Sequence, residues 1–460
     1  MMDIHHTEKI DLRNKAVTII GLGESGKAAA GLANYVGARV FVSDTGSNRK
    51  ISEYAMDLMH QLIACETGLH SNRIYEADLW VISPGVPKNA DIIKVAKEKN
   101  IPIVSEIEFA SWFTESPIIA VTGSNGKTTT VNILAEMCQT DDHTSVLAGN
   151  VGMPFSEKTL DELMSPNPKT IYVLEISSFQ MEFIQNFCPT IAVYTNISPD
   201  HLDRHGSLDE YITMKLNMVK NMSKSGHIVF NADDPQLAIS FENHKMGLAP
   251  FSLLQSDVTF PLNSTKVYNS NGDSLVKIDE VALPGKHNLA NMLAAATAAH
   301  LIGISDEHIS HVLKKFKGVE HRLEQVTTIG NVLFINDSKA TNLDSVIVAL
   351  ESFNQPIVLI LGGQNKGADF RLLLPHIKSS HVRDVITYGE AGEEIMTAIG
   401  DAVRSVQVTD LRSAVVTAHE MAAPGDVVLL SPGCASFDQF MNFEERGQFF
   451  KTLISEIAVA

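Results

Sequence analysis

Short apolar runs rich in Val and Ile alternate along the chain with longer stretches of helical spacing. Runs of about four to eight apolar residues between turn signals are typical of buried parallel strands, and the stretches between them are typical of connecting helices. The alternation predicts an α/β protein with parallel sheets covered by helices. The runs fall into three blocks, from which we predict domains at residues 1–113, 114–320 and 321–460.

The apolar runs of each block predict the strands of one sheet. In the first block they are AVTIIGLG at 16–23, ARVFVSD at 38–44 and LWVIS at 79–83, followed by the turn signal Ser83-Pro84-Gly85. In the second they are PIIAVTG at 117–123, TIYVLEIS at 170–177, IAVYTNIS at 191–198 and HIVFNADD at 227–234. In the third they are NVLFIND at 331–337, PIVLILGG at 356–363, VRDVITYGE at 382–390 and DVVLLSPG at 426–433.

The end of the second block has a different pattern. Residues 250–283 predict a β-rich excursion with a hairpin at Asn271-Gly272. The Ala-rich stretch NLANMLAAATAAHLIG at 288–303 then predicts a packed helix that ends at Gly303.

Composition and charge limit the possible partners. The chain has 460 residues, 44% of them hydrophobic, and a formal net charge of −18. These values are typical of globular domains, and the negative charge disfavours binding to nucleic acid or to a membrane surface. Four dispersed cysteines form no CxxC pair, which disfavours a zinc site or disulfide framework. Because the sequence has no signal-like segment and no apolar run of about 18 residues, we expect a cytoplasmic protein.

The first glycine loop leaves its ligand open. Gly21-Leu22-Gly23-Glu24-Ser25-Gly26 matches G-x-G-x-x-G between a predicted strand and helix, and Asp44 ends the next strand. Alone, this fingerprint favours an NAD-dependent oxidoreductase with Asp44 on a ribose. The glycines are also compatible with close strand-to-helix packing and no ligand, so we infer only that a nucleotide-type ligand is favoured.

The second glycine loop, TGSNGKTTT at 122–130, predicts an ATP site. A strand ends at Val121 and a helix begins after the lysine. Backbone N–H groups, the helix dipole and the Lys127 ammonium then converge on polyphosphate, and the Thr128 hydroxyl can reach Mg²⁺. The loop departs from G-x-x-x-x-G-K-[ST] because Val121 stands at the first glycine.

Three titratable residues mark a candidate catalytic centre. Glu175 ends a predicted strand, where a carboxylate near a P-loop can hold Mg²⁺ or activate a nucleophile. His201 lies in the polar segment DHLDRH after the next strand, where a histidine is usually only solvated, but the density of titratable groups there favours a functional role. Lys215 interrupts the apolar face of a predicted helix. Such a lysine usually extends its ammonium to solvent, but a desolvated amine that could be modified is the alternative.

The sequence resembles the Mur ligase family of peptidoglycan synthesis. The resemblance is carried, in order through nearly the whole chain, by TGSNGKTT, LEISSFQME, NISPDHLDRHG, the Lys215 helix, GKHNLANMLAA, GVEHRLE and NDSKATN. It implies a Rossmann-like UDP-binding N-terminal domain, a central P-loop ATPase-type α/β domain and a C-terminal Rossmann-like domain. The segments GLGESG, SPGVP and LSPGCASFDQFMNFEERG, and the absence of D-N-P-R, are similar to the member that joins D-glutamate to UDP-N-acetylmuramoyl-L-alanine.

The resemblance also implies roles for individual residues. Lys127, His201, Lys215 and Lys339 are expected to be catalytic. The metal ligands are expected to be Thr128, Glu175, His201 and Lys215 as a carbamate. ATP is expected to contact Gly123, Ser124, Asn125, Gly126, Lys127, Thr128, Thr129, Asn288, Asn291, Arg322 and Asp337. The UDP-sugar is expected at Ser25, Asp44, Thr45, Gly85, Asn150 and Ser177, and D-glutamate at Thr341, Lys366, Ser436 and Phe443, with Lys339 beside them.

The implied reaction is amide formation through an acyl phosphate, with ATP and Mg²⁺ as cofactors and small molecules as the only partners of a monomer. His201 either assists proton transfer from the amine or positions metal and substrate. Gly46 stands where this ligase often has arginine, which alters the uracil side of the pocket. The competing interpretations are a folylpolyglutamate synthetase, which needs no full N-terminal domain of this kind, an NAD-dependent oxidoreductase and a non-catalytic binding protein.

Overall fold

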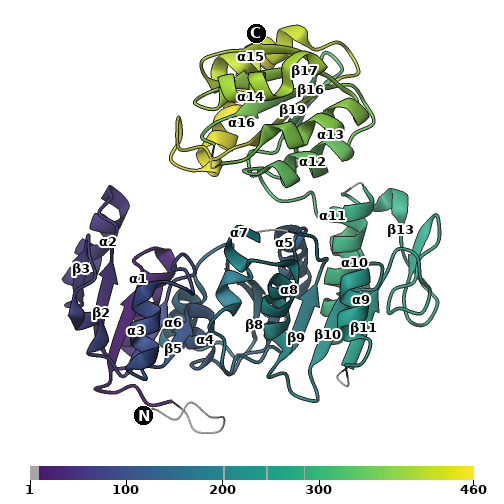
Figure 1. Cartoon of the computed structure of the whole chain (residues 1–460). Coiled ribbons are helices and arrows are strands. Elements are labelled where there is room, and N and C mark those ends of the chain that lie inside the picture. Colours follow the sequence, from purple (N-terminus) through teal and green to yellow (C-terminus); the bar gives the residue numbers. More distant parts are fainter. Residues whose placement is uncertain (1–9, 200–201, 245–246, 284, 366, 460) are drawn as a thin grey trace. The chain divides into compact units, whose positions relative to one another are not determined.

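The computed structural model describes residues 10–199, 202–244, 247–283, 285–365 and 367–459. The chain divides into two compact units, residues 1–316 and 317–460. The first unit contains two parallel sheets and a two-stranded hairpin, and the second contains one mixed sheet (Figure 1). The α/β class is therefore confirmed, whereas the three domain boundaries stay predictions.

The first sheet has the strand order β3-β2-β1-β4-β5, and its strands are parallel. Its strands are β1 (Ala16–Ile20), β2 (Arg39–Asp44), β3 (Ala64–Thr67), β4 (Leu79–Ile82) and β5 (Ile103–Ser105). The helices of this part are α1 (Glu24–Tyr35), α2 (Arg49–His60), α3 (Asp91–Glu98) and α4 (Glu106–Ser111), with the 3₁₀ turn η1 (Asn72–Tyr75). The apolar runs predicted for β1, β2 and β4 supply the centre of this sheet, and the Gly-rich loop follows β1 at its carboxyl end.

The second sheet has the order β11-β10-β9-β6-β8-β7 and is also parallel. Its strands are β6 (Ile118–Thr122), β7 (Thr144–Gly149), β8 (Thr170–Glu175), β9 (Ile191–Tyr194), β10 (His227–Asn231) and β11 (Gly247–Phe251). The helices are α5 (Lys127–Cys138), α6 (Phe155–Met164), α7 (Leu202–His205), α8 (Leu208–Leu216), α9 (Pro235–Phe241), α10 (Lys286–Leu301) and α11 (Asp306–Lys315). Three 3₁₀ turns complete this part, η2 (Phe179–Met181), η3 (Asn217–Val219) and η4 (Ile278–Glu280).

The hairpin predicted at residues 271–272 is confirmed. Strands β12 (Lys266–Tyr268) and β13 (Ser274–Lys277) pair antiparallel, and Gly272 between them has φ +84°, a conformation that glycine adopts at little cost. The packed Ala-rich helix is confirmed as α10. Gly303, with φ +96°, follows its end as a C-terminal glycine.

A buried carboxylate joins the first two sheets. Glu108 on α4 is inaccessible to solvent, and its oxygens accept from the backbone N–H groups of Gln185, Asn186 and Phe187 at 3.0, 2.8 and 2.7 Å. The indole N–H of Trp112 donates to the same carboxylate at 2.8 Å. Four N–H groups thus satisfy the buried Glu108 carboxylate, and together they hold α4 against the segment before β9.

The second unit has the strand order β14-β15-β19-β16-β17-β18, in which only the β14–β15 pair is antiparallel among the described pairs. Its strands are β14 (Glu324–Ile329), β15 (Val332–Asn336), β16 (Ile357–Gly362), β17 (Val382–Tyr388), β18 (Arg404–Gln407) and β19 (Val427–Gly433). The helices are α12 (Leu343–Glu351), α13 (Leu374–Ser379), α14 (Gly392–Ile399), α15 (Leu411–Met421) and α16 (Phe443–Val459), with 3₁₀ turns η5 (Phe370–Leu373) and η6 (Gly400–Ala402). No helix in the described part of the chain has the length and apolar character needed to cross a bilayer.

Candidate active site

The P-loop lies between β6 and α5, as the sequence predicts. Gly123 and Gly126 have φ +152° and +82°, and a Cβ at either position would collide with a neighbour, Thr195 Oγ1 or Asn291 Oδ1. The loop conformation is therefore restricted to glycine at both points. Asn196 Oδ1 accepts from Asn125 N at 2.8 Å, which ties the loop to the end of β9.

Lys127 opens α5 and folds back over its own loop. Its Nζ donates to the carbonyl oxygens of Gly123 and Ser124 at 2.8 and 2.7 Å. Thr128 and Thr129 follow in the first helical turn and are buried. The loop thus gathers one ammonium, two hydroxyls and the N-terminus of a twelve-residue helix, the groups that bind a polyphosphate.

Lys215 lies in the same site. Its side chain is only 1% exposed, and its Nζ donates to Gly123 O at 2.8 Å and lies 4.5 Å from the centre of the Tyr211 ring. The Tyr211 hydroxyl is 3.0 Å from Ser124 Oγ, so the helix α8 is held against the P-loop. The interpretation that this lysine extends to solvent is wrong, and the desolvated amine is what the structure describes.

Glu175 ends β8 and is 2% exposed. Its Oε1 accepts from Asn150 Nδ2 at 2.8 Å, whereas its Oε2 has no hydrogen-bond partner among the described residues. A buried carboxylate oxygen without a donor is unfavourable unless a cation is bound to it. Glu175 therefore fits a Mg²⁺ ligand, and Asn150, predicted as a sugar-nucleotide contact, lies beside this oxygen pair.

The remaining predicted ATP contacts of this unit lie at the start of α10. Asn291 is buried next to Gly126, and Asn288 lies one turn earlier. His201, predicted as a catalytic and metal-binding residue, lies outside the described residues. Arg322 and Asp337 belong to the second unit.

A cavity of about 760 Å³ lies at the carboxyl end of the first sheet. Four of the six residues predicted for the UDP-sugar line it, namely Ser25, Asp44, Thr45 and Gly85. Asn150 and Ser177 are not among its lining residues, and the Ser177 hydroxyl instead donates to Gln180 Oε1 at 3.0 Å. The cavity thus accounts for one end of the predicted substrate site.

The Asp44 carboxylate is already engaged with backbone groups. It accepts from Leu22 N at 2.5 Å and Gly46 N at 2.6 Å, so it shapes the glycine loop. Sequence reasoning missed two basic residues that line the same cavity, Lys50 and His70. Lys50 lies four residues beyond Gly46, where an arginine was expected, and its Nζ is 2.7 Å from Glu24 Oε1.

In the second unit, Asp337 follows β15 and is 4% exposed. It accepts from Ser431 Oγ at 2.8 Å and Leu323 N at 3.1 Å, and burial raises its pKa to about 7. Arg322 is half-buried one residue before Leu323. These contacts bring two of the predicted ATP residues to one end of the sheet.

The described residues among those predicted for D-glutamate lie on two loops, one after β15 (Thr341, with Lys339) and one from β19 to the start of α16 (Ser436 and Phe443). Lys339 Nζ lies 5.4 Å from the centre of the Phe443 ring, Ser436 is buried, and Thr341 is exposed. Lys366 lies outside the described residues.

Arg446 connects these two loops and was not singled out from the sequence. It is fully buried and donates to Ser338 Oγ at 2.9 Å, Ser338 O at 2.7 Å and Cys434 O at 3.1 Å. Ser338 Oγ in turn donates to Phe443 O at 2.8 Å. Arg446 thereby fixes the segment that carries Lys339 relative to the segment that carries Ser436. Its only sequence signal was its place in NFEERG, a segment that contributed to the resemblance.

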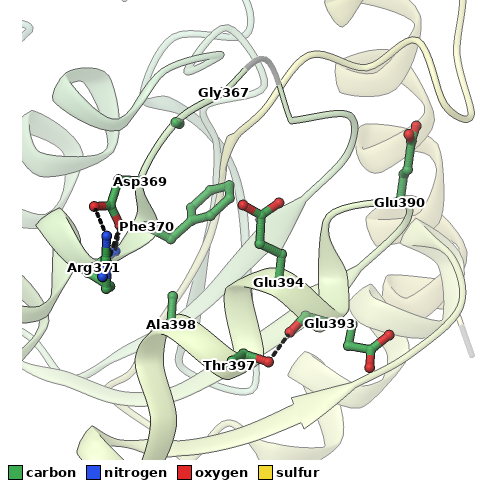
Figure 2. A pocket seen from close by; sticks show the side chains of 10 residues that line it. Gly367, Asp369, Phe370, Arg371, Glu390, Glu393, Glu394, Thr397 and Ala398 are labelled. Carbon is green, nitrogen blue, oxygen red and sulfur yellow. Dashed lines mark hydrogen bonds and ion pairs between the residues drawn. The ribbon is translucent and has the colours of Figure 1, made fainter.

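A second cavity, of about 820 Å³, contains none of the predicted site residues among its lining residues (Figure 2). Glu390, Glu393 and Glu394 lie on one side of it, while Asp369 pairs with Arg371 on another at 2.7 Å. Since this lining is predominantly acidic, it is unsuited to the two carboxylates of glutamate.

Glu320, His321 and Glu324 also come close enough to hold a metal ion. The Lys451 ammonium already lies 2.6 Å from Glu320 Oε1 and 2.8 Å from Glu324 Oε1. The Lys451 ammonium therefore already occupies one oxygen of each carboxylate and offsets part of their charge, so this cluster gives no reason to expect a metal.

Comparisons with known proteins agree with this architecture. Family models match residues 15–105 (Mur ligase MurD-like, N-terminal domain), 121–299 (Mur ligase middle domain) and 321–434 (Mur ligase, glutamate ligase domain). A UDP-N-acetylmuramoylalanine–D-glutamate ligase of Salinibacter ruber is 37% identical over 97% of this chain and 99% of its own, and that of Christiangramia forsetii is 39% identical over 96% and 100%. The MurF ligase of Thermotoga maritima, solved in complex with ADP, shares the fold with a TM-score of 0.60 at 15% identity, over 98% of this chain and 100% of its own. With three family models in order and relatives matched end to end, this chain belongs to the Mur ligase family.

Proposed function

We propose that this protein uses ATP to join D-glutamate to UDP-N-acetylmuramoyl-L-alanine in peptidoglycan precursor synthesis. The observation that carries the proposal is the convergence of Lys127, Lys215 and Thr128 on one P-loop, together with the unpartnered oxygen of Glu175. The end-to-end match to relatives that bear the name of this ligase supports the choice of substrates.

We assign ATP to the P-loop. The loop precedes the N-terminus of α5, where backbone N–H groups can bind phosphate oxygens, and Lys127 can transfer its bonds from loop carbonyls to the γ-phosphate. Asn288 and Asn291 are assigned in this proposal to the rest of the nucleotide.

Mg²⁺ fits Glu175 Oε2, the Thr128 hydroxyl and a carboxylated Lys215, with His201 as a further ligand. When bound, the ion neutralises charge on the transferred phosphoryl group. The buried Lys215 amine would supply an acceptor only after carbamylation, because an ammonium repels a cation. We therefore include the carbamate in the proposal.

The first chemical step converts a poor acylating agent into a reactive one. The carboxylate of the muramoyl-alanine attacks the γ-phosphorus of ATP, forming an acyl phosphate and releasing ADP. Lys127 and Lys339 stabilise the negative charge that moves to the phosphoryl oxygens. The acyl phosphate must be kept from water until the amine attacks it.

The second step forms the amide bond. The neutral amine of D-glutamate attacks the acyl carbon, loses a proton and expels inorganic phosphate, with His201 as the candidate for the proton transfer. Lys339, Thr341, Lys366, Ser436 and Phe443 are proposed to hold the amino acid. The buried Arg446 supports this assignment because it fixes the two loops that carry most of them.

Inorganic phosphate release tests the proposal. Purified protein is mixed with ATP, Mg²⁺, UDP-N-acetylmuramoyl-L-alanine and D-glutamate, and each component is omitted in turn. We expect phosphate only from the complete mixture, and little with L-glutamate, L-lysine or L-alanine in place of D-glutamate. Phosphate release independent of the sugar nucleotide, or a preference for another amino acid, would refute it.

A further inference from the structure

Arg204 on α7 connects three segments that are far apart in sequence. Its guanidinium donates to Glu182 through Nε at 3.2 Å and Nη2 at 2.9 Å, and Nη2 also donates to the backbone oxygen of Val86 at 3.1 Å. The guanidinium carbon lies 4.2 Å from the centre of the Phe179 ring. One side chain thus joins α7, the segment after β8 and the segment after β4.

These contacts are shielded from water. The side chain of Glu182 is 1% exposed and that of Arg204 is 18% exposed. Charge-assisted bonds in such surroundings are stronger and more directional than those of surface pairs. The planar guanidinium is also needed, because it serves a carboxylate and a carbonyl at once while lying over an aromatic ring, which a lysine ammonium cannot reproduce.

Each of the three segments leads to a part of the candidate active site. Val86 lines the 760 Å³ cavity with Ser83, Pro84 and Gly85. Glu182 and Phe179 follow Glu175, the carboxylate with the unpartnered oxygen. His205 is next to Arg204, and its Nε2 lies 2.9 Å from Ser178 Oγ. This is a second contact that holds α7 and the segment after β8 together.

We propose that Arg204 is a positioning residue that sets the wall of the sugar-nucleotide cavity, residues 83–87, at the right distance from Glu175 and the P-loop. The inference rests on the proposed function, because it requires the sugar nucleotide to span from that cavity to the phosphate site. Arg204 acts through Val86 and Glu182 and needs no contact with substrate. Its loss would shift the pyrophosphate and sugar relative to the γ-phosphate.

The chain offers a matched control at the same junction. Lys88 Nζ lies 3.2 Å from Glu210 Oε2 on α8, so this pair also connects the segment after β4 to the part of the chain that carries the P-loop. Its side chains are 36% and 57% exposed, and exposed pairs contribute little to stability or orientation. Lys88→Ala therefore removes a cross-junction ion pair without removing a buried constraint.

The test compares Arg204→Lys with Lys88→Ala and the native protein. Arg204→Lys keeps a positive charge beside Glu182 but loses the bond to Val86 O. We expect its KM and its calorimetric Kd for UDP-N-acetylmuramoyl-L-alanine to rise by about tenfold, the usual effect of losing a hydrogen bond to a charged group. The KM values for ATP and D-glutamate are expected to stay within about twofold, as are all constants of Lys88→Ala.

Unchanged sugar-nucleotide affinity in Arg204→Lys would overturn the inference, and so would an equal rise of all three KM values accompanied by a lowered melting temperature. Should this variant fail to fold, the double variant Arg204→Gln, Glu182→Gln, which leaves no unpaired buried charge, takes its place with the same expected result. Failure of the native protein to bind the sugar nucleotide would instead refute the proposed function.

Discussion

Lys127 and Lys215 donate to one acceptor, the carbonyl oxygen of Gly123, each at 2.8 Å. Two ammonium groups on different helices therefore point at the same turn of the P-loop. Two cations this close repel each other, and the repulsion is relieved either by a bound polyphosphate or by conversion of the Lys215 amine to the proposed carbamate. It also means that a change at one lysine alters the electrostatic surroundings of the other.

Lys127→Ala is expected to lower kcat by a hundredfold or more, on the order of the loss seen when one charge-stabilising group is removed from an active site. The Lys127 side chain is half-buried and donates to two loop carbonyls, outside the apolar core, so the variant is expected to fold and to keep its melting temperature within a few degrees. Phosphate release and a thermal melt check both parts. Turnover near the native rate would remove the P-loop assignment.

Lys215→Ala is expected to lose about a hundredfold or more in kcat and to regain part of it in acetate or bicarbonate, which can supply the missing carboxylate. Lys224→Ala, which removes an exposed lysine eight residues beyond α8, is the control and is expected to show neither loss nor rescue. Carbon-13 NMR of native protein in labelled bicarbonate provides a direct readout. An unmodified amine in fully active protein would refute the carbamate.

Arg322→Ala is expected to raise the KM for ATP by about tenfold and the KM for D-glutamate by less than twofold, because we propose that Arg322 makes a charge-assisted bond to the nucleotide. Arg371→Ala serves as the control, since Arg371 is an exposed arginine of the same unit that pairs with Asp369. Steady-state kinetics with ATP and D-glutamate varied separately give the two KM values for each variant. A selective rise for D-glutamate would reassign Arg322.

Two buried carboxyl groups predict how stability depends on pH. Burial raises the pKa of Glu106 to about 7 from 4.5 and that of Asp337 to about 7 from 3.8. The folded state holds these two protons more tightly than the unfolded chain does. The contribution of Glu106 and Asp337 to the free energy of unfolding is therefore largest at low pH. It falls as pH rises from about 4 to 7 and then levels off.

Glu106→Gln is expected to flatten this dependence, since the amide cannot ionise. Near pH 8 the variant should be more stable than the native protein by up to about 3 kcal/mol, the value that corresponds to the pKa difference of Glu106. Urea unfolding at pH 5 and pH 8 measures both effects. Glu98→Gln, at an exposed glutamate on α3, is expected to change neither value. A variant as pH-sensitive as the native protein would contradict the role of Glu106.

The central strands and the P-loop were predictable because their signals are local. The continuous apolar runs of β1, β6 and β16 are buried along most of their length, and the glycine loop bridges a strand and a helix. Edge strands such as β3 and β7 were not predicted, because their half-buried residues form no such run. The antiparallel strand β14 was not predicted either, because its residues are also only half-buried or exposed.

Contacts between distant segments could not be predicted from spacing. The burial of Lys215 depends on Gly123, which lies 92 residues earlier, and helical periodicity alone favours a lysine that reaches solvent. Arg204, Glu182 and Val86 likewise meet only in the folded chain. Each lies in a segment that contributed to the resemblance, but nothing in the spacing of those segments indicates that the three residues meet.

The buried Glu108 carboxylate has a consequence for how this protein is made. Its backbone donors lie 77 to 79 residues further along the chain, so they emerge from the ribosome well after α4. Until they arrive, the nascent N-terminal region must either leave α4 undocked or enclose an unsatisfied charge, which costs several kcal/mol. An isolated fragment ending at residue 113 is thus a poor folding unit, and the first sheet reaches its final stability only after synthesis has passed residue 187.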